Sequence, residues 1–307
     1  MNHDLLAADT AMGPVTLLVA DLDAMTRYYR DAVTLSVLSD GDAASRSPLG
    51  ESGAAASRAT HNTVTLGRGT TPVIVLEHSP ELARSTPMTA GLFHTAILFE
   101  TQTSLAAAVH SVATHSPGTF TGSSDHLVSQ AFYFTDPEGN GIELYWDRDR
   151  TEWSWTHGQV EMATLYLDPN EFLREHLTDE AIEQPMLGGA SVGHVHLQVG
   201  DTASAREFYV DRLGFEATAS LGNSALFVSA GGYHHHMAMN TWNSAGAGRR
   251  AHTLGLGLVD IVVPTADDLG ELNERMSHFS TPARDDGQSL SFEDPWANLI
   301  RVRAAHS

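Results

Sequence analysis

The sequence contains no cysteine, which excludes disulfide bonds and metal sites built on thiolate ligands. Positive charge is scarce, with 17 Lys and Arg residues against 38 Asp and Glu residues, and the formal net charge is −21. Such a field repels phosphate backbones and argues against nucleic-acid binding, and we interpret the acidity as a solubility or halotolerance trait. No apolar run is long enough to span a bilayer, and the opening segment "MNHDLLAADT" lacks the pattern of a signal peptide. We therefore expect no membrane association and a cytoplasmic location.

Histidine, by contrast, is frequent, with 17 residues in a chain of 307. In the absence of cysteine, imidazole and carboxylate groups would have to supply any metal site. The length allows two ordinary domains, and the hydrophobic content of 42% is typical of a soluble globular protein.

The chain repeats itself in two ways. "MGPVTLLVAD" at 12–21 matches "VGHVHLQVGD" at 192–201 with an offset of 180 residues, and a tyrosine follows each copy at the same distance. "GLFHTAILFETQTSLAAAV" at 91–109 matches "GLGLVDIVVPTADDLGELN" at 255–273 with an offset of 164 residues. Each copy has the alternation of a strand followed by an amphipathic helix. Both copies of the second kind later reach an Asp-Pro turn and a final strand.

These repeats predict an α+β fold of four modules, each with one strand, one helix and about three further strands. The modules lie at roughly 10–85, 90–148, 190–245 and 252–305. We divide the chain into an N-terminal pair of modules over 1–150, a linker over 151–189 and a C-terminal pair over 190–307. The linker is expected to contain one helix near 169–183, and the Ser-, Ala- and Gly-rich stretch 40–62 a hairpin with an exposed loop.

Four βαβββ modules that pair into two open barrels resemble the vicinal oxygen chelate superfamily. Its members include glyoxalase, bleomycin-resistance proteins and type I extradiol dioxygenases. The resemblance covers nearly the whole chain outside the linker.

One face of each opening strand is apolar, and the other is expected to look into the barrel. On that second face the second module has His94 and the third has His194, where the first has Pro14. The closing strand of the second module adds Glu143, where the fourth has Arg301. Two histidines and one carboxylate on one face of a ferrous ion leave positions open for substrate and O2.

These positions predict how the modules pair. His94 and Glu143 belong to the second module and His194 to the third. We therefore expect modules 2 and 3 to close one barrel and modules 1 and 4 the other. A pairing of 1 with 2 and 3 with 4 would split the three ligands.

A longer motif is more specific. "SDHLVSQAFYFTDPEGNGIE" at 124–143 resembles the extradiol ring-cleavage signature through His126, Tyr133, the Asp-Pro turn and Glu143, although Ser124 is not the usual residue at its place. Together with "GGYHHHMAMNTW" at 231–242, it makes the chain similar to two-domain bacterial catechol 2,3-dioxygenases.

That resemblance implies extradiol cleavage of a catechol by O2 to a 2-hydroxymuconic semialdehyde, and self-association into a homo-oligomer. The implied cofactor is Fe(II), or Mn(II) with the same ligands, held by His94, His194 and Glu143. On a strand, His234 and His236 would share one face and His235 would take the other. The resemblance implies a catalytic histidine on this strand, and His236 is our choice. Either His236 or His126 would take a proton from the substrate or donate a hydrogen bond to bound oxygen, and Tyr133 would donate a hydrogen bond to the substrate oxygen. The weaker pocket residues are His196, His234, Trp146 and Met237.

Two other functions stay open. A glyoxalase-like isomerase or lyase would normally need a second carboxylate, and Glu77 is the obvious one, although the expected pairing places it in the other barrel. A metal-free binding or resistance protein would have no need for the aligned histidines and glutamate. A purely structural role for the "YHHH" cluster is a further alternative.

Overall fold

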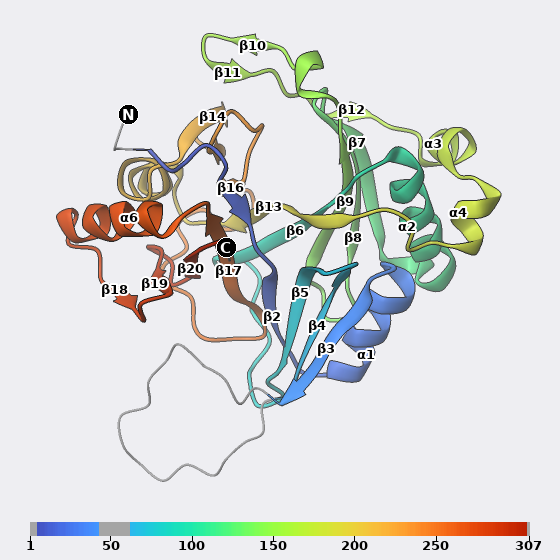
Figure 1. Cartoon of the computed structure of the whole chain (residues 1–307), viewed down its shortest axis with the longest axis horizontal. Coiled ribbons are helices and arrows are strands. Elements are labelled where there is room, and N and C mark those ends of the chain that lie inside the picture. Colours follow the sequence, from blue (N-terminus) through green and yellow to red (C-terminus); the bar gives the residue numbers. More distant parts are fainter. Residues whose placement is uncertain (1–4, 43–61, 306–307) are drawn as a thin grey trace.

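The computed structural model describes residues 5–42 and 62–305, and two curled mixed sheets dominate these residues (Figure 1). We call them sheet I and sheet II. Sheet I has the order β18-β19-β20-β17-β2-β5-β4-β3, with β1 paired to β17. Its strands are β1 (Ala11–Met12), β2 (Val15–Val19), β3 (Ser36–Asp42), β4 (Asn62–Arg68), β5 (Thr71–His78), β17 (Gly255–Val263), β18 (Ala283–Asp285), β19 (Ser289–Glu293) and β20 (Leu299–Ala304).

Sheet II has the order β12-β7-β8-β9-β6-β13-β16-β15-β14. Its strands are β6 (Gly91–Phe99), β7 (Phe120–Asp125), β8 (Ser129–Thr135), β9 (Gly141–Asp147), β12 (Leu165–Tyr166), β13 (Ala190–Gln198), β14 (Glu216–Leu221), β15 (Ala225–Ser229) and β16 (Met237–Asn240). A separate hairpin pairs β10 (Trp155–Thr156) with β11 (Gln159–Val160).

The sheet order confirms the expected pairing of modules. Sheet I takes its strands from modules 1 and 4, and sheet II from modules 2 and 3 with β12 added from the linker. The opening strands β6 and β13 lie antiparallel at the centre of sheet II, with His94 opposite His196. The opening strands β2 and β17 join in the same way in sheet I.

Each opening strand leads into a helix, as predicted, and each of the two kinds of repeat begins its helices with its own type of N-cap. Asp21 and Asp201 accept backbone hydrogen bonds at 2.8 Å at the starts of α1 (Leu22–Arg27) and α5 (Thr202–Arg206). Both helices continue as a π-helical turn, η1 (Tyr28–Ala32) and η4 (Glu207–Arg212). Capping boxes begin α2 (Gln102–His115) and α6 (Ala266–His278). Duplicated sequence thus gives duplicated local structure.

The linker departs from prediction. The single helix expected over 169–183 is wrong, because α3 (Pro169–His176) ends before an extended Leu177 and α4 (Asp179–Glu183) starts afresh. Thr178 caps α4 by accepting the Ala181 N–H at 3.2 Å. Short 3₁₀ turns occur at η2 (Pro117–Thr119) and η3 (Arg150–Glu152). The chain division at 150 and 190 stays a prediction.

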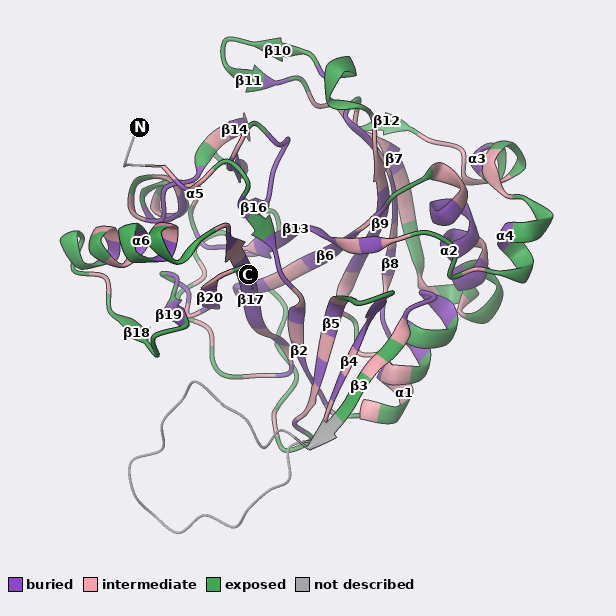
Figure 2. Ribbon diagram, viewed as in Figure 1, coloured by how far each residue is buried: buried purple, intermediate pink, exposed green. Residues whose placement is uncertain are grey.

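In the region expected to form a hairpin, β3 and β4 pair antiparallel, whereas the loop between them lies outside the described residues. One large cluster of buried hydrophobic residues has members from both sheets and from the helices α1, α2 and α6, and Figure 2 colours the buried residues purple. The two sheets are tied together by buried polar contacts. Tyr29 of module 1 donates to Asp136 of module 2 at 3.1 Å, and Tyr209 of module 3 donates to Asp294 of module 4 at 2.9 Å. The sheets join modules 1 with 4 and 2 with 3, whereas these bonds join 1 with 2 and 3 with 4.

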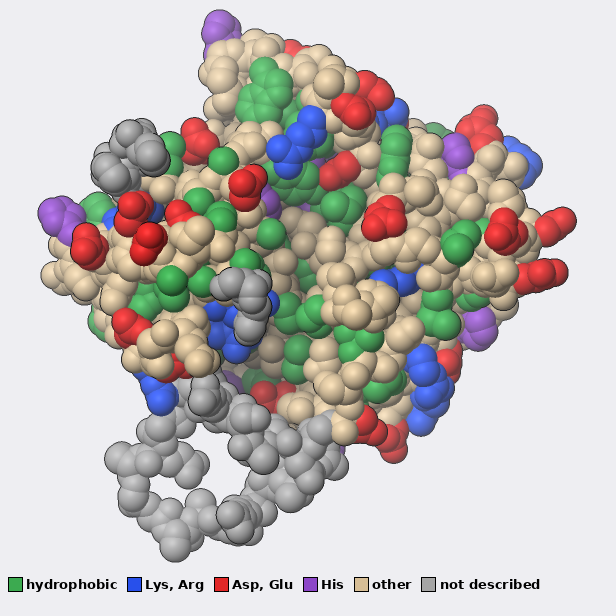
Figure 3. Space-filling view, viewed as in Figure 1, with side chains coloured by type: hydrophobic (Ala, Val, Ile, Leu, Met, Phe, Trp, Pro, Cys, Tyr) green, Lys and Arg blue, Asp and Glu red, His purple; other side chains and the backbone are tan. Residues whose placement is uncertain are grey.

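In the described part of the chain, no helix is both long and apolar enough to cross a membrane. On the face shown in Figure 3, acidic side chains are scattered rather than gathered into one patch.

Candidate metal centre

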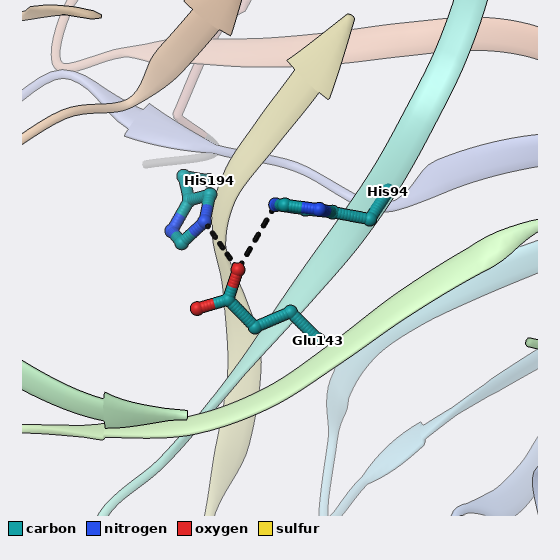
Figure 4. Close-up of side chains that lie close together, drawn as sticks. All are labelled: His94, Glu143 and His194. Atoms are coloured by element: carbon teal, nitrogen blue, oxygen red, sulfur yellow. Dashed lines mark hydrogen bonds and ion pairs between the residues drawn. The ribbon is translucent and has the colours of Figure 1, made fainter. Parts of the chain in front are cut away.

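Three strands of sheet II bring His94, Glu143 and His194 together (Figure 4). Central strand β6 carries His94, and its two neighbours β9 and β13 carry Glu143 and His194. The ligand atoms all lie within 4.8 Å of one another. Glu143 Oε2 is 2.9 Å from His94 Nε2 and 3.2 Å from His194 Nε2. All three side chains are buried.

This arrangement fits a divalent cation. His94 Nε2 is buried without a hydrogen-bond partner, although Glu143 Oε2 lies 2.9 Å away, because the geometry is not that of a hydrogen bond. Burial outweighs the attraction of Glu143 and lowers the pKa of His194 to about 4, so this imidazole is neutral at neutral pH. Neutral imidazole and carboxylate are the donors that Fe(II), Mn(II) and Zn(II) accept. His194 Nε2 is hydrogen-bonded to Glu143 Oε2 at 3.2 Å, and a cation among the three side chains would replace that hydrogen bond and also bind His94 Nε2, which has no hydrogen-bond partner.

The three side chains line a cavity of about 1220 Å³. Among the sequence-predicted residues, His126, Tyr133 and His196 also line it. The linker contributes more than was predicted, since eight of its residues lie along the same wall: Thr156, His157, Gln159, Val160, Glu161, Met162, Ala163 and Thr164.

His126 and Tyr133 form a hydrogen-bonded pair in the cavity wall. His126 Nδ1 lies 2.7 Å from the carbonyl oxygen of Ala163, and His126 Nε2 lies 2.7 Å from the Tyr133 hydroxyl. A carbonyl oxygen only accepts, so Nδ1 carries the hydrogen and a neutral ring accepts from Tyr133 through Nε2. Burial, reinforced by Glu143, raises the pKa of Tyr133 well above its usual range, which keeps the hydroxyl protonated.

His196 lies beside the metal centre without joining it. Its ring centroid is 4.9 Å from that of His94, and its Nε2 is 3.0 Å from the Asn240 side-chain nitrogen. Phe93 and Trp242 pack against His196 with centroid distances of 5.0 and 5.4 Å. This side of the cavity is therefore an aromatic wall.

His235 lines the cavity, whereas His236, the histidine chosen from the sequence, does not. Gly231 and Gly232 have φ angles of 61° and 67° and form a turn, so strand β16 begins only at Met237. Strand alternation therefore does not apply across the three histidines. The ring centroid of His235 is 4.1 Å from that of His194, and His235 lines the cavity. His236 instead accepts the Ala230 N–H at 3.2 Å, away from the lining residues.

Three of the weaker pocket residues, Trp146, Met237 and His234, do not line the cavity. Trp146 lies on the opposite face of β9 from Glu143 and packs against the core. Met237 pairs with Val195 on the apolar face of sheet II and is completely buried. His234 is buried against Asp147, with Nε2 2.9 Å from the carboxylate.

His235 is the cavity residue that the sequence did not single out. Burial lowers the pKa of its imidazole well below the usual range.

The equivalent place in sheet I has a different chemistry. Arg301 and Arg303 each lie within hydrogen-bond distance of the buried Asp260, at 2.7 and 2.8 Å. Residues 5–42 and 62–305 contain no second group of metal-ligating side chains besides that of His94. Sheet I, built from the modules that contain Pro14 and Arg301, thus has an ion pair where sheet II has its candidate ligands.

Comparison with known proteins agrees with this architecture. The family description "Glyoxalase/Bleomycin resistance protein/Dioxygenase superfamily" matches residues 11–144 and 191–302. A Bacillus subtilis (strain 168) protein named catechol-2,3-dioxygenase is 31% identical over 295 residues, which are 94% of this chain and 94% of that protein.

Two solved structures share the fold at low sequence identity. A candidate dioxygenase of Bacillus subtilis subsp. subtilis str. 168 has a TM-score of 0.63 and 13% identity, and the match covers 98% of this chain and 86% of that chain. Glyoxalase I from Zea mays has a TM-score of 0.57 and 12% identity, with 96% and 92% covered. The family match spans most of the chain, and the chain therefore belongs to the glyoxalase/bleomycin resistance protein/dioxygenase superfamily.

Proposed function

We propose that this protein cleaves a catechol with O2 beside its two hydroxyl groups, giving a 2-hydroxymuconic semialdehyde. The observation that carries the proposal is the set of His94, Glu143 and His194 at the wall of one large cavity. Two histidines and one carboxylate are typical of non-heme Fe(II) oxygenases. The relative named catechol-2,3-dioxygenase supports the same activity.

His94, Glu143 and His194 would hold the metal. Fe(II), when bound, supplies open coordination positions for the catechol oxygens and O2 and makes a coordinated hydroxyl more acidic. His235 lies against His194 and lines the cavity, so we assign it the acid–base role first given to His236. Its task is to accept the hydrogen of a catechol hydroxyl.

The pair of His126 and Tyr133 can switch the direction of its hydrogen bond. While His126 is neutral, its Nε2 accepts from the Tyr133 hydroxyl. When His126 takes up a proton at Nε2, it donates to the Tyr133 oxygen, and the tyrosine hydrogen becomes available to a substrate oxygen. The pair can therefore stabilise negative charge on the substrate and return a proton later in the reaction.

The glyoxalase-like alternative is less well supported. Glu77, the extra carboxylate that this reaction would call for, lies on β5 of sheet I. In the described residues, the group of metal-ligating side chains contains one carboxylate, Glu143. The likeness to maize glyoxalase I concerns the fold. In a metal-free binding protein, the buried His94 Nε2 would have neither a hydrogen-bond partner nor a metal ion to bind.

The experiment is a product assay on protein purified without oxygen and loaded with Fe(II). We expect catechol and air to give a yellow product, with one O2 consumed for each catechol cleaved. Loading with Mn(II) in parallel identifies which ion supports turnover. Formation of lactoylglutathione from methylglyoxal and glutathione, with no ring cleavage, would replace our proposal with the glyoxalase-like one. Glu143→Gln should abolish turnover, and the control His236→Asn should keep it.

A further inference from the structure

A hydrogen-bonded chain runs from His235 away from the cavity to a carboxylate. His235 Nδ1 lies 2.8 Å from His234 Nδ1, and His234 Nε2 lies 2.9 Å from Asp147 Oδ1. The other carboxylate oxygen of Asp147 accepts from the Tyr233 hydroxyl at 2.7 Å. His234 is completely buried, and the Asp147 side chain is 16% exposed. None of these contacts is part of the mechanism above.

The chemistry of each group sets the direction of the chain. A carboxylate only accepts hydrogen bonds, so His234 Nε2 must carry a hydrogen. A neutral His234 then has a lone pair on Nδ1 and can only accept there. The short contact with His235 therefore requires the hydrogen on His235 Nδ1. This leaves the lone pair of His235 on Nε2, for which the described residues provide no hydrogen-bond partner.

We propose that Asp147 and His234 are positioning residues, which hold His235 as the Nδ1–H tautomer so that its Nε2 accepts a substrate hydroxyl hydrogen. The neutral side chain of free histidine favours a hydrogen on Nε2, so the protein has to impose the Nδ1–H tautomer. The hydroxyl as partner of Nε2 rests on the proposed function, whereas the tautomer itself does not.

The surroundings make the arrangement rigid. Asp147 is on the same face of β9 as Glu143 and Tyr145, because alternate strand residues point the same way. The Tyr145 hydroxyl is 2.7 Å from that of Tyr233. A Cβ at Gly193 would lie 1.7 Å from the Tyr145 hydroxyl oxygen, so the glycine of β13 makes room for this network.

Aromatic packing fixes the plane of His234. The Tyr233 ring lies 4.1 Å from His234 between centroids, and the Trp153 ring lies 5.2 Å from it. The Arg150 guanidinium lies over both of these aromatic rings, at 5.3 and 5.7 Å. His234 therefore cannot easily turn away from Asp147.

The direct test is nitrogen NMR on protein with ¹⁵N-labelled histidine, loaded with diamagnetic Zn(II). We expect the His235 signals to show a hydrogen on Nδ1 and a bare Nε2, and those of His234 a hydrogen on Nε2. A hydrogen on His235 Nε2 would overturn the proposal, because His234 would then be the donor. This measurement needs no activity and no substitution beyond those used for assignment.

Two substitutions at His234 separate positioning from structure. His234→Leu removes the acceptor, and we expect His235 to change tautomer and kcat to fall about 10- to 100-fold, with KM within about threefold. His234→Asn offers a side-chain oxygen near the place of Nδ1 and should restore much of kcat. Tyr233→Phe is the matched control, since it removes the other hydrogen bond to Asp147 and leaves His234 in place.

The outcomes distinguish this proposal from the proposed function. If the tautomer is found but no catechol is cleaved, positioning stands and the reaction assignment fails. If catechol is cleaved while His234→Leu keeps both full kcat and the tautomer, the positioning role is refuted. Metal content is measured on every variant, so that loss of the metal centre is not mistaken for loss of positioning.

Discussion

We expect the metal-free protein to lose stability as the pH falls from 7.5 to 5, and His236 to account for a definable share of that loss. Burial lowers the pKa of His236 from its ordinary 6.5 to about 3. The unfolded chain therefore binds a proton below pH 6.5 that the folded chain refuses until about pH 3. The stabilising effect of the neutral ring is complete above pH 6.5 and is lost as the pH falls below that value.

The magnitude follows from linkage. One pKa unit corresponds to about 1.4 kcal/mol, and pH 5 lies about 1.5 units below the unfolded value, so His236 alone should cost about 2 kcal/mol at pH 5 relative to pH 7.5. His236→Asn removes the titration and keeps an acceptor for the Ala230 N–H. The variant should therefore lose about 2 kcal/mol less than the wild-type chain over this range.

The assay is urea unfolding of both metal-free proteins at pH 7.5, 6.5, 5.5 and 5. The difference between their free energies of unfolding should stay constant above pH 6.5. Below pH 6.5 the variant should become more stable relative to the wild-type protein. Parallel curves throughout would refute the reasoning and show that His236 titrates normally in the folded state. Catechol cleavage by the metal-loaded variant should be unchanged, because His236 lies outside the cavity lining.

Three further outcomes follow from buried contacts. Tyr209→Phe removes the hydrogen bond to Asp294, and we expect urea unfolding to show a free energy of unfolding lower by about 1–3 kcal/mol. The control Tyr166→Phe, on a residue that is 83% exposed, should leave this free energy unchanged. Equal effects of the two substitutions would contradict the stabilising role of the Tyr209 hydrogen bond. Tyr133→Phe should lower kcat about 100-fold at unchanged metal content in steady-state assays, and an unchanged kcat would exclude Tyr133 from the reaction. Asp260→Asn weakens the buried ion pairs with Arg301 and Arg303, and urea unfolding should show a free energy of unfolding lower by about 3–5 kcal/mol. Metal content should stay the same, because Asp260 lies in sheet I, and a loss of metal would contradict the independence of the two sheets.

Duplication made much of the fold predictable. A duplicated segment shows its strand and helix twice, and the contrast between His194 in one copy and Pro14 in the other indicates which copy has the candidate metal ligands. His94, Glu143 and His194 could bind one cation only if they lie close together, so their positions in the sequence also indicate which modules share a sheet. The observed order of sheet II agrees with that argument.

The remaining errors have a common physical origin in irregular backbone. Strand alternation predicts side-chain direction only while the strand lasts, and the turn at Gly231 and Gly232 interrupts it before His235. The two glycines were the available signal. The lining provided by the linker, including the Ala163 carbonyl that holds His126, arises from tertiary contacts between distant segments. Local patterns in the sequence do not predict contacts of this kind.

The most direct test is the metal content of anaerobically loaded protein, measured beside that of a His94→Ala variant. We expect one Fe(II) per wild-type chain and less than about a tenth of that in the variant, in line with the loss of one of three ligands. A variant that retains a full equivalent of iron would contradict the assignment of His94, Glu143 and His194 as the metal centre.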